Sequence, residues 1–269
     1  MRKLIKKRVS LFGLEIDALR MPEAVERVLT WIAHPQGACQ YIVTPNVDHA
    51  VMFQKDVALR SAYGAAGLVL ADGLPVVWAS RLLRRGLPER IAGSDLVPEL
   101  FEAARRRSGP ALRVFLLGAM PGVAERATAN IERRWANVKV AGVYSPPFGF
   151  EKSSQQNDDI LAQIADAQAD LLIVGLGAPK QELWVHRHRD RLRVPVAVCA
   201  GATIDFLAGE KRRAPRWMQR VGLEWFHRMA SEPRRLVRRY FRDAVVFPQL
   251  VWRELRQERK RTPLMDKCS

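Results

Sequence analysis

Residues 170–182 read Asp-Leu-Leu-Ile-Val-Gly-Leu-Gly-Ala-Pro-Lys-Gln-Glu, and this stretch indicates the fold. The continuous apolar run 171–174 is typical of a strand that is buried on both faces of a parallel sheet. Gly175 and Gly177 then allow a sharp turn and a close approach of the backbone to a ligand. Pro179 suits the first turn of a helix, where a missing N–H costs little. The stretch therefore predicts a strand, a tight turn and a helix.

Three polar residues occupy the first turn of that predicted helix: Lys180, Gln181 and Glu182. They follow the carboxyl end of the strand, which is where open α/β sheets bind their ligands. Together with Gly177 they favour a polar ligand, and an ordinary turn with a solvated helix start is the alternative. The glycine spacing matches neither the dinucleotide fingerprint nor a phosphate-binding loop. We therefore expect no dinucleotide cofactor.

Similar apolar runs recur through the first 200 residues, at 41–43, 68–70, 113–117, 139–143 and 196–199. Helical patterns separate them, at 22–33, 48–63, 75–84, 95–107, 123–135, 158–167 and 180–191. This alternation predicts a doubly wound, Rossmann-like α/β fold with helices on both faces of a parallel sheet. An additional strand or hairpin is expected at 9–16 and a loop at 145–157.

The charge is distributed unevenly along the chain. The formal net charge is +16, and residues 211–269 hold 17 Lys and Arg against 6 Asp and Glu. No strand pattern follows residue 205, and two helical patterns rich in tryptophan and arginine take its place. We therefore expect a catalytic α/β domain at 1–209 and a basic amphipathic helical appendage at 210–269. Such a basic block points to phosphate in a nucleic acid, an anionic lipid or a phosphorylated substrate.

Several classes of protein are excluded by composition. No run reaches the roughly 18 apolar residues of a membrane span, and the basic start of the chain is not followed by the apolar core of a signal peptide. The cysteines, at 39, 199 and 268, fit neither a disulfide framework nor a zinc site. No carboxylate group resembles a Mg²⁺ site. We expect a cytoplasmic protein without a bound metal or cofactor.

Polar residues follow the predicted strands, and the ends of parallel strands meet at one edge of a sheet. Asp72 follows a buried run and precedes a glycine, so it is a candidate acid/base group, with a helix N-cap as the alternative. Thr44 and Asn46 could bind a ligand, although capping of the next helix is favoured. Arg90 could grip a phosphate or be solvated. Gly118 begins a possible anion site at a helix N-terminus.

In combination, these segments resemble a known family. They include Thr-Pro-Asn at 44–46, Ala-Asp-Gly-Leu-Pro-Val-Val at 71–77, Glu-Arg-Ile-Ala-Gly-Ser-Asp-Leu at 89–96, Val-Gly-Leu-Gly-Ala-Pro-Lys-Gln-Glu at 174–182 and Gly-Ala-Thr-Ile-Asp-Phe-Leu-Ala-Gly at 201–209. In this order they resemble the WecG/TagA/CpsF family of bacterial glycosyltransferases (glycosyltransferase family 26). The resemblance runs from about residue 10 to 245. It departs at Ser145–Phe150 and at 46–49, where relatives more often carry Ala and Glu.

The resemblance implies an inverting, metal-independent transfer of N-acetylmannosamine or a related sugar. The donor would be a UDP-sugar and the acceptor a polyprenyl-diphosphate-linked sugar at the inner face of the cytoplasmic membrane. By the same resemblance Asp72 is the base, Arg90 holds the diphosphate, and Thr44, Asn46 and Gln181 line the sugar pocket.

The appendage is predicted to contact both the membrane and the substrate. Its arginines recur at spacings of three and four, so several share one helix face. Three of them are expected to bind the anionic membrane surface and to close over the diphosphates: Arg235, Arg238 and Arg239. A nucleic-acid-binding protein that uses 211–261 and a Rossmann-type oxidoreductase are the alternatives. Their signatures are missing, so nucleic acid is not an expected partner. Homo-oligomer formation is left open.

Overall fold

The computed structural model describes residues 7–35, 37–107, 109–211, 213–215, 217–218, 222–231 and 233–261. Its strands are β1 Arg8–Leu11, β2 Leu14–Asp17, β3 Gln40–Val43, β4 Leu68–Val69, β5 Leu112–Gly118, β6 Val138–Tyr144, β7 Leu171–Gly175 and β8 Val196–Cys199. Its helices are α1 Met21–Ala33, α2 Val47–Phe53, α3 Val57–Gly64, α4 Leu74–Leu82, α5 Gly93–Arg106, α6 Val123–Arg134, η1 Phe150–Lys152, α7 Ser154–Asp166, α8 Lys180–His188, α9 Thr203–Ala208, α11 Glu224–Ser231 and α12 Pro233–Arg261. The two elements expected at 9–16 form the antiparallel hairpin β1–β2.

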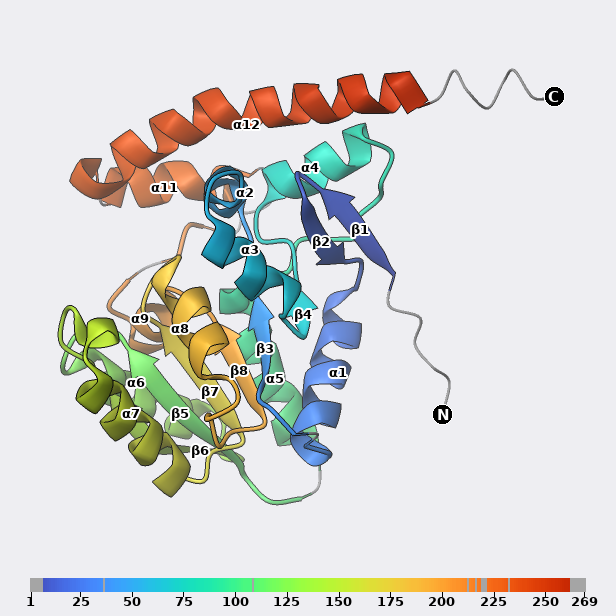
Figure 1. Ribbon diagram of the computed structural model, residues 1–269. Helices are drawn as coiled ribbons and strands as arrows, with labels where there is room; N and C mark the ends of the chain where they lie inside the picture. The colour runs from blue at the N-terminus through green and yellow to red at the C-terminus, as the bar shows by residue number, and fades with distance from the viewer. Residues whose placement is uncertain are drawn as a thin grey trace.

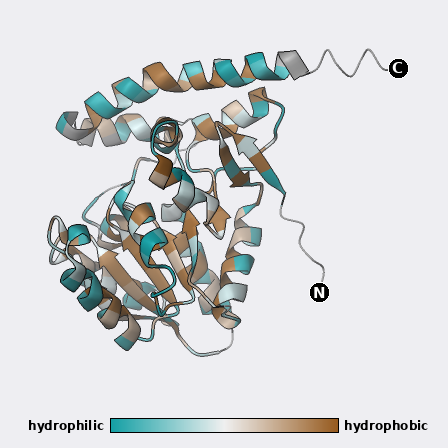
Figure 2. Ribbon diagram, viewed as in Figure 1, coloured by the Kyte–Doolittle hydropathy of each residue, from teal (hydrophilic) through white to brown (hydrophobic). Residues whose placement is uncertain are grey.

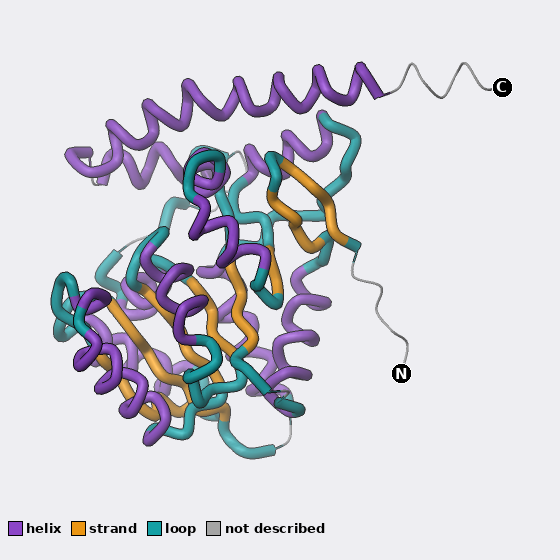
Figure 3. The backbone as a smooth tube through the Cα atoms, in the orientation of Figure 1, coloured by secondary structure: helices purple, strands orange, loops and turns teal. Residues whose placement is uncertain are grey.

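Six strands form one parallel sheet in the order β4-β3-β8-β7-β5-β6 (Figures 1 and 3). The chain builds the β5–β6 side first and returns through β7 and β8 to meet β3. As a result, loops from distant parts of the sequence lie together at the carboxyl edge of the sheet. The predicted doubly wound α/β fold is confirmed.

A separate apolar core covers each face of the sheet. Side chains of β7 alternate between the two cores, because successive residues of a strand point to opposite faces. Leu171 and Ile173 join the core beneath α1, α5, α6 and α9, whereas Leu172 and Val174 join the core beneath α2, α3, α7 and α8. Figure 2 shows the apolar residues concentrated in the strands and on the inner sides of the helices.

Two predicted boundaries are wrong, and polar capping explains both. The single helix expected at 48–63 is divided into α2 and α3, since the side chain of Asp56 accepts a hydrogen bond from Leu59 N and starts a new helix. The loop expected at 145–157 ends earlier, because Ser153 caps α7 through Gln156 N. Side-chain capping competes with the continuing backbone pattern in both places.

Helix α12 crosses the carboxyl edge of the sheet above α2, α4 and the hairpin (Figure 1). Leu250 is buried in the core on that face, and the ring of Phe247 packs edge-on against Phe12 with centroids 5.2 Å apart. The carboxylate of Glu254 accepts a hydrogen bond from Phe12 N. Among the helices that the structure describes, none has the length and apolarity needed to cross a membrane.

Candidate functional site

A cavity of about 530 Å³ lies between the carboxyl edge of the sheet and α12. The loops after β3, β4, β7 and β8 form its floor, and residues of α12 form its roof. Seven of the residues predicted from the sequence line it: Thr44, Asn46, Asp72, Arg90, Gly177, Gln181 and Arg239. The topology of the sheet therefore gathers most of the predicted site into one place.

Asp72 lies at this cavity and does not cap the following helix. Its backbone N–H donates to Pro45 O at 2.8 Å, which joins the loops after β3 and β4. Gly73 occupies the N-cap position of α4 with φ +114°, a conformation that suits glycine. The sharp turn at Gly73 thus separates the carboxylate of Asp72 from the helix and leaves it at the cavity wall.

Arg90 is held among three carboxylates. Its Nη2 lies 2.6 Å from Asp95 Oδ2, and its Nη1 lies 3.1 Å from Glu224 Oε2 and 3.8 Å from Asp72 Oδ1. Asp95 also accepts a hydrogen bond from Arg213 Nη1 at 2.5 Å. A guanidinium has five donors in a rigid fork, so one side chain can serve several partners at once. Arg90 thereby ties α5 and α11 to Asp72.

Asn46 fulfils both roles that the sequence left open. Its side chain caps α2 by accepting a hydrogen bond from His49 N at 3.3 Å, and it also lines the cavity. Thr44 is 8% exposed and lies beside it in the loop after β3. Gln181 faces the cavity from α8, and its Oε1 accepts a hydrogen bond from Gly201 N at 3.1 Å.

Three other predicted residues do not line the cavity. Lys180 lies outside it because its Nζ is 3.1 Å from Glu151 Oε2. Glu182 is 1% exposed, and its Oε1 lies 3.4 Å from His49 Nε2 within the protein. Gly118 packs against its neighbour strand, since a Cβ there would lie 2.5 Å from the carbonyl oxygen of Gly175. Burial and strand packing account for these positions.

The appendage arginines differ from one another in position. Arg239 lines the cavity, and its Nε lies 3.1 Å from Asp48 Oδ2. Arg238 is exposed and outside the cavity. The side chain of Arg235 falls outside what the structure describes. Only Arg239 of these three is thus shown at the predicted site, where it is paired with a carboxylate.

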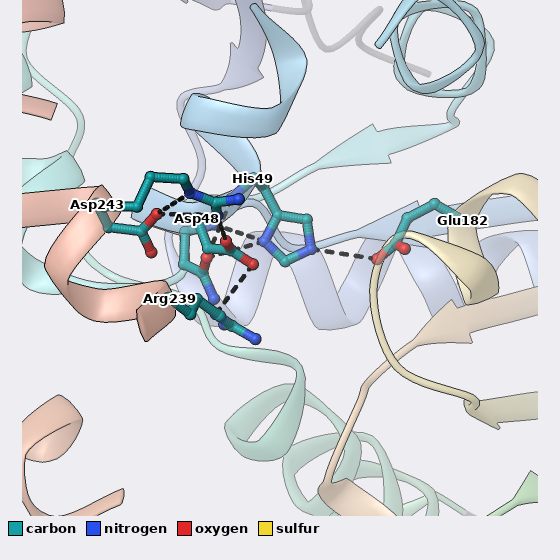
Figure 4. A network of polar contacts seen from close by, with 7 residues as sticks. Asp48, His49, Glu182, Arg239 and Asp243 are labelled. Atoms are coloured by element: carbon teal, nitrogen blue, oxygen red, sulfur yellow. Dashed lines mark hydrogen bonds and ion pairs between the residues drawn. The ribbon is translucent and has the colours of Figure 1, made fainter. Parts of the chain in front are cut away.

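A buried cluster of charges at the cavity roof was missed by the sequence analysis (Figure 4). Asp48 is 5% exposed and pairs with Arg239 and Arg242. Asp243 is 3% exposed, and burial, reinforced by the charge of Asp48, raises its pKa above the ordinary value. The four-residue spacing of Arg239 and Asp243 on α12 was a usable signal, whereas nothing near Asp48 indicated this partnership.

Within the part of the chain that the structure describes, no group of three or more His, Cys, Asp or Glu could hold a metal ion. Positive charge at the cavity comes instead from Arg90 and Arg239. A developing negative charge is stabilised when fixed positive groups are already in place, because little reorganisation is then needed. The arrangement offers a carboxylate beside a cavity that also carries arginines.

Comparison with known proteins decides the class. Over residues 9–261 the chain matches the family described as "Glycosyl transferase WecG/TagA/CpsF family". This protein belongs to that family. The match covers the hairpin, the sheet and α12, so both walls of the cavity lie within it. The predicted family and the predicted enzyme class, a glycosyltransferase, are confirmed.

Two relatives of this WecG/TagA/CpsF protein carry the same name, N-acetylglucosaminyldiphosphoundecaprenol N-acetyl-beta-D-mannosaminyltransferase. The protein from Bacillus subtilis (strain 168) is 34% identical over 197 residues, which is 73% of each chain. The protein from Staphylococcus aureus (strain MW2) is 30% identical over 234 residues, which is 86% of this chain and 87% of the relative.

Proposed function

We propose that this glycosyltransferase moves N-acetylmannosamine, or a related sugar, from a UDP-sugar to a polyprenyl-diphosphate-linked acceptor in the synthesis of a cell-surface polysaccharide. The observation that carries the proposal is Asp72 at the wall of the cavity, with Arg90 Nη1 3.8 Å from its carboxylate. The names of the relatives support this choice of sugar and acceptor. No resident cofactor is part of the proposal.

Asp72 acts as the general base in this reaction. A carboxylate that accepts the proton of the acceptor hydroxyl makes that oxygen a better nucleophile toward the anomeric carbon. Attack from the side opposite the leaving diphosphate inverts the anomeric centre. The positive side chains of Arg90 and Arg239 then offset the charge that collects on the diphosphate. Each arginine exchanges one of its carboxylate partners for phosphate oxygens when the donor binds.

The experiment offers the protein a panel of UDP-sugars with a synthetic N-acetylglucosamine-diphosphate lipid, and mass spectrometry identifies the product. UDP-N-acetylmannosamine is expected to give one added N-acetylhexosamine. Asp72→Asn keeps the shape and removes the basicity, so its turnover should fall by about 10²–10⁴-fold with donor binding little changed. Transfer at nearly the wild-type rate by Asp72→Asn would contradict the role of this residue as base. No product from any UDP-sugar would contradict the function.

The proposed location is the inner face of the cytoplasmic membrane, reached through α12. Four exposed apolar residues lie within about 80° of one another on a helix of 3.6 residues per turn: Val237, Phe241, Val245 and Trp252. Exposed arginines flank them, including Arg234 and Arg238. Apolar side chains bordered by basic residues are the pattern of helices that lie in a lipid interface. The cavity-lining residues of α12 are on its other side.

Vesicle flotation tests this location with variants that spare the cavity. The double change Val237→Ser and Phe241→Ser removes exposed apolar area from α12, and it is expected to reduce binding to vesicles of phosphatidylglycerol and phosphatidylcholine. The matched control is Val57→Ser, because Val57 is also exposed but lies on α3. Equal flotation of the double variant and the control would contradict the membrane contact. Raised salt should weaken binding, since it screens the arginines.

A further inference from the structure

An unbroken line of polar contacts joins two residues of the cavity wall through the protein interior. Asn46 Oδ1 lies 2.9 Å from His49 Nδ1, and His49 Nε2 lies 3.4 Å from Glu182 Oε1 (Figure 4). The same Glu182 oxygen accepts a hydrogen bond from Gln181 Nε2 at 2.8 Å. The line therefore runs from the loop after β3, through α2, to the start of α8.

The His49–Glu182 pair is buried and contacts more than its own helices require. The side chains of His49 and Glu182 are 8% and 1% exposed. Burying charged or polar groups costs free energy unless they are paired. An apolar contact between α2 and α8 would have been cheaper. Both ends of the line instead reach an amide that lines the cavity, namely Asn46 and Gln181.

Backbone donors fix which end of each amide is left for a ligand. His49 N donates to Asn46 Oδ1, and Gly201 N donates to Gln181 Oε1. A backbone N–H can only donate, so the atoms that receive these bonds are the amide oxygens. Glu182 takes one hydrogen of Gln181 Nε2. What remains on both amides for a ligand is N–H, and the matching ligand atom is a hydrogen-bond acceptor.

We propose that His49 and Glu182 are positioning residues that hold the amides of Asn46 and Gln181 as a pair of N–H donors for the acetamido carbonyl oxygen of the donor sugar. This inference rests on the proposed function, because it takes the donor to be a 2-acetamido sugar. The pair acts through the two amides and takes no part in proton transfer. It makes the site selective for an acetamido group over a hydroxyl at the same carbon.

Steady-state kinetics with UDP-N-acetylmannosamine and with UDP-mannose measures that selectivity. His49→Ala and Glu182→Ala each free one amide to turn. A buried hydrogen-bonding group left without its partner costs about 1–3 kcal/mol, so kcat/KM for the acetamido donor should fall about tenfold, mainly through KM. The value for the hydroxyl donor should change little. His49→Gln keeps a donor toward Glu182 and should recover part of the loss.

The control is Trp184→Phe, on the same helix as Glu182. It removes a buried hydrogen bond, from Trp184 Nε1 to Asn157 Oδ1 at 2.7 Å, without touching the line. It should lower the melting temperature and leave the acetamido-to-hydroxyl ratio as in the wild type.

An unchanged ratio in folded His49→Ala and Glu182→Ala would overturn the proposal, as would an equal fall of the ratio in Trp184→Phe. If either alanine variant does not fold, His49→Gln and Glu182→Gln decide in the same way. Failure of the wild type to use any 2-acetamido donor would be a different result, because it would contradict the proposed function itself.

Discussion

Replacement of Asp48 by asparagine tests how firmly α12 is joined to the rest of the protein. Asp48 lies on α2, and its carboxylate pairs with Arg239 Nε at 3.1 Å and with Arg242 Nη2, both on α12. These partners are about 190 residues away along the chain. Asp48→Asn preserves the size of the side chain and removes the charge that both arginines share. The two helices then lose the ion pairs that connect them at the cavity roof.

The size of the effect follows from burial. Two hydrogen bonds to a charged group contribute about 1.5–3 kcal/mol each, and breaking a fully buried pair costs about 3–5 kcal/mol. The side chains of Arg239 and Arg242 are 30% and 47% exposed, so water recovers part of this loss. Relief of the repulsion with Asp243 recovers more. We therefore expect a loss of about 2 kcal/mol, which is a fall in Tm of about 4 °C for a chain of this length.

Two measurements follow from this expectation: thermal unfolding, and the rate of tryptic cleavage within α12. Local opening exposes the many arginines of this helix, so cleavage should be faster in Asp48→Asn. Asp158→Asn is the matched control, because Asp158 pairs with Arg191 at 2.6 Å with both side chains more than half exposed. Exposed pairs contribute about 0–1 kcal/mol. The reasoning is refuted if Asp48→Asn behaves like this control in both measurements.

The remaining predictions concern charge at the same cavity. Burial raises the pKa of Asp243 above its ordinary 3.8, so ionisation of this carboxyl destabilises the folded state as pH rises through the folded pKa. Asp243→Asn should therefore have the higher Tm at pH 7, and the difference should vanish below about pH 3.8; a variant less stable at pH 7 would contradict this. Transfer should also persist in excess EDTA, because Arg90 and Arg239 supply the positive charge, and a loss restored by Mg²⁺ would disprove it.

The predicted strands agree closely with the observed ones, because each is a local apolar pattern. The run at 196–199 is β8 itself, and the run at 171–174 is β7 without Gly175. Burial on both faces of a parallel sheet demands such runs whatever the rest of the chain does. The helix predicted at 48–63 was wrong because its periodicity continues across Asp56, while the actual end depends on one side-chain hydrogen bond.

The site was predicted well where a residue directly follows a strand and less well on the helices. Asp72 and Gln181 reach the cavity, as the convergence of strand ends requires. Lys180 and Glu182 flank Gln181 in sequence, yet successive helical residues point about 100° apart. One therefore meets Glu151 and the other His49. Spacing alone could not say which of the three faces the cavity.

The sequence by itself determined the sheet, its alternating helices and the family, because these depend on apolar periodicity and on contiguous motifs. Only the tertiary structure decided what closes the cavity and how its groups are held. Asp48 meets α12, and His49 meets Glu182, across separations that no local pattern records. Such pairs form after the chain has folded, because burial in a shared interior makes an unpaired charge costly and so selects its partner.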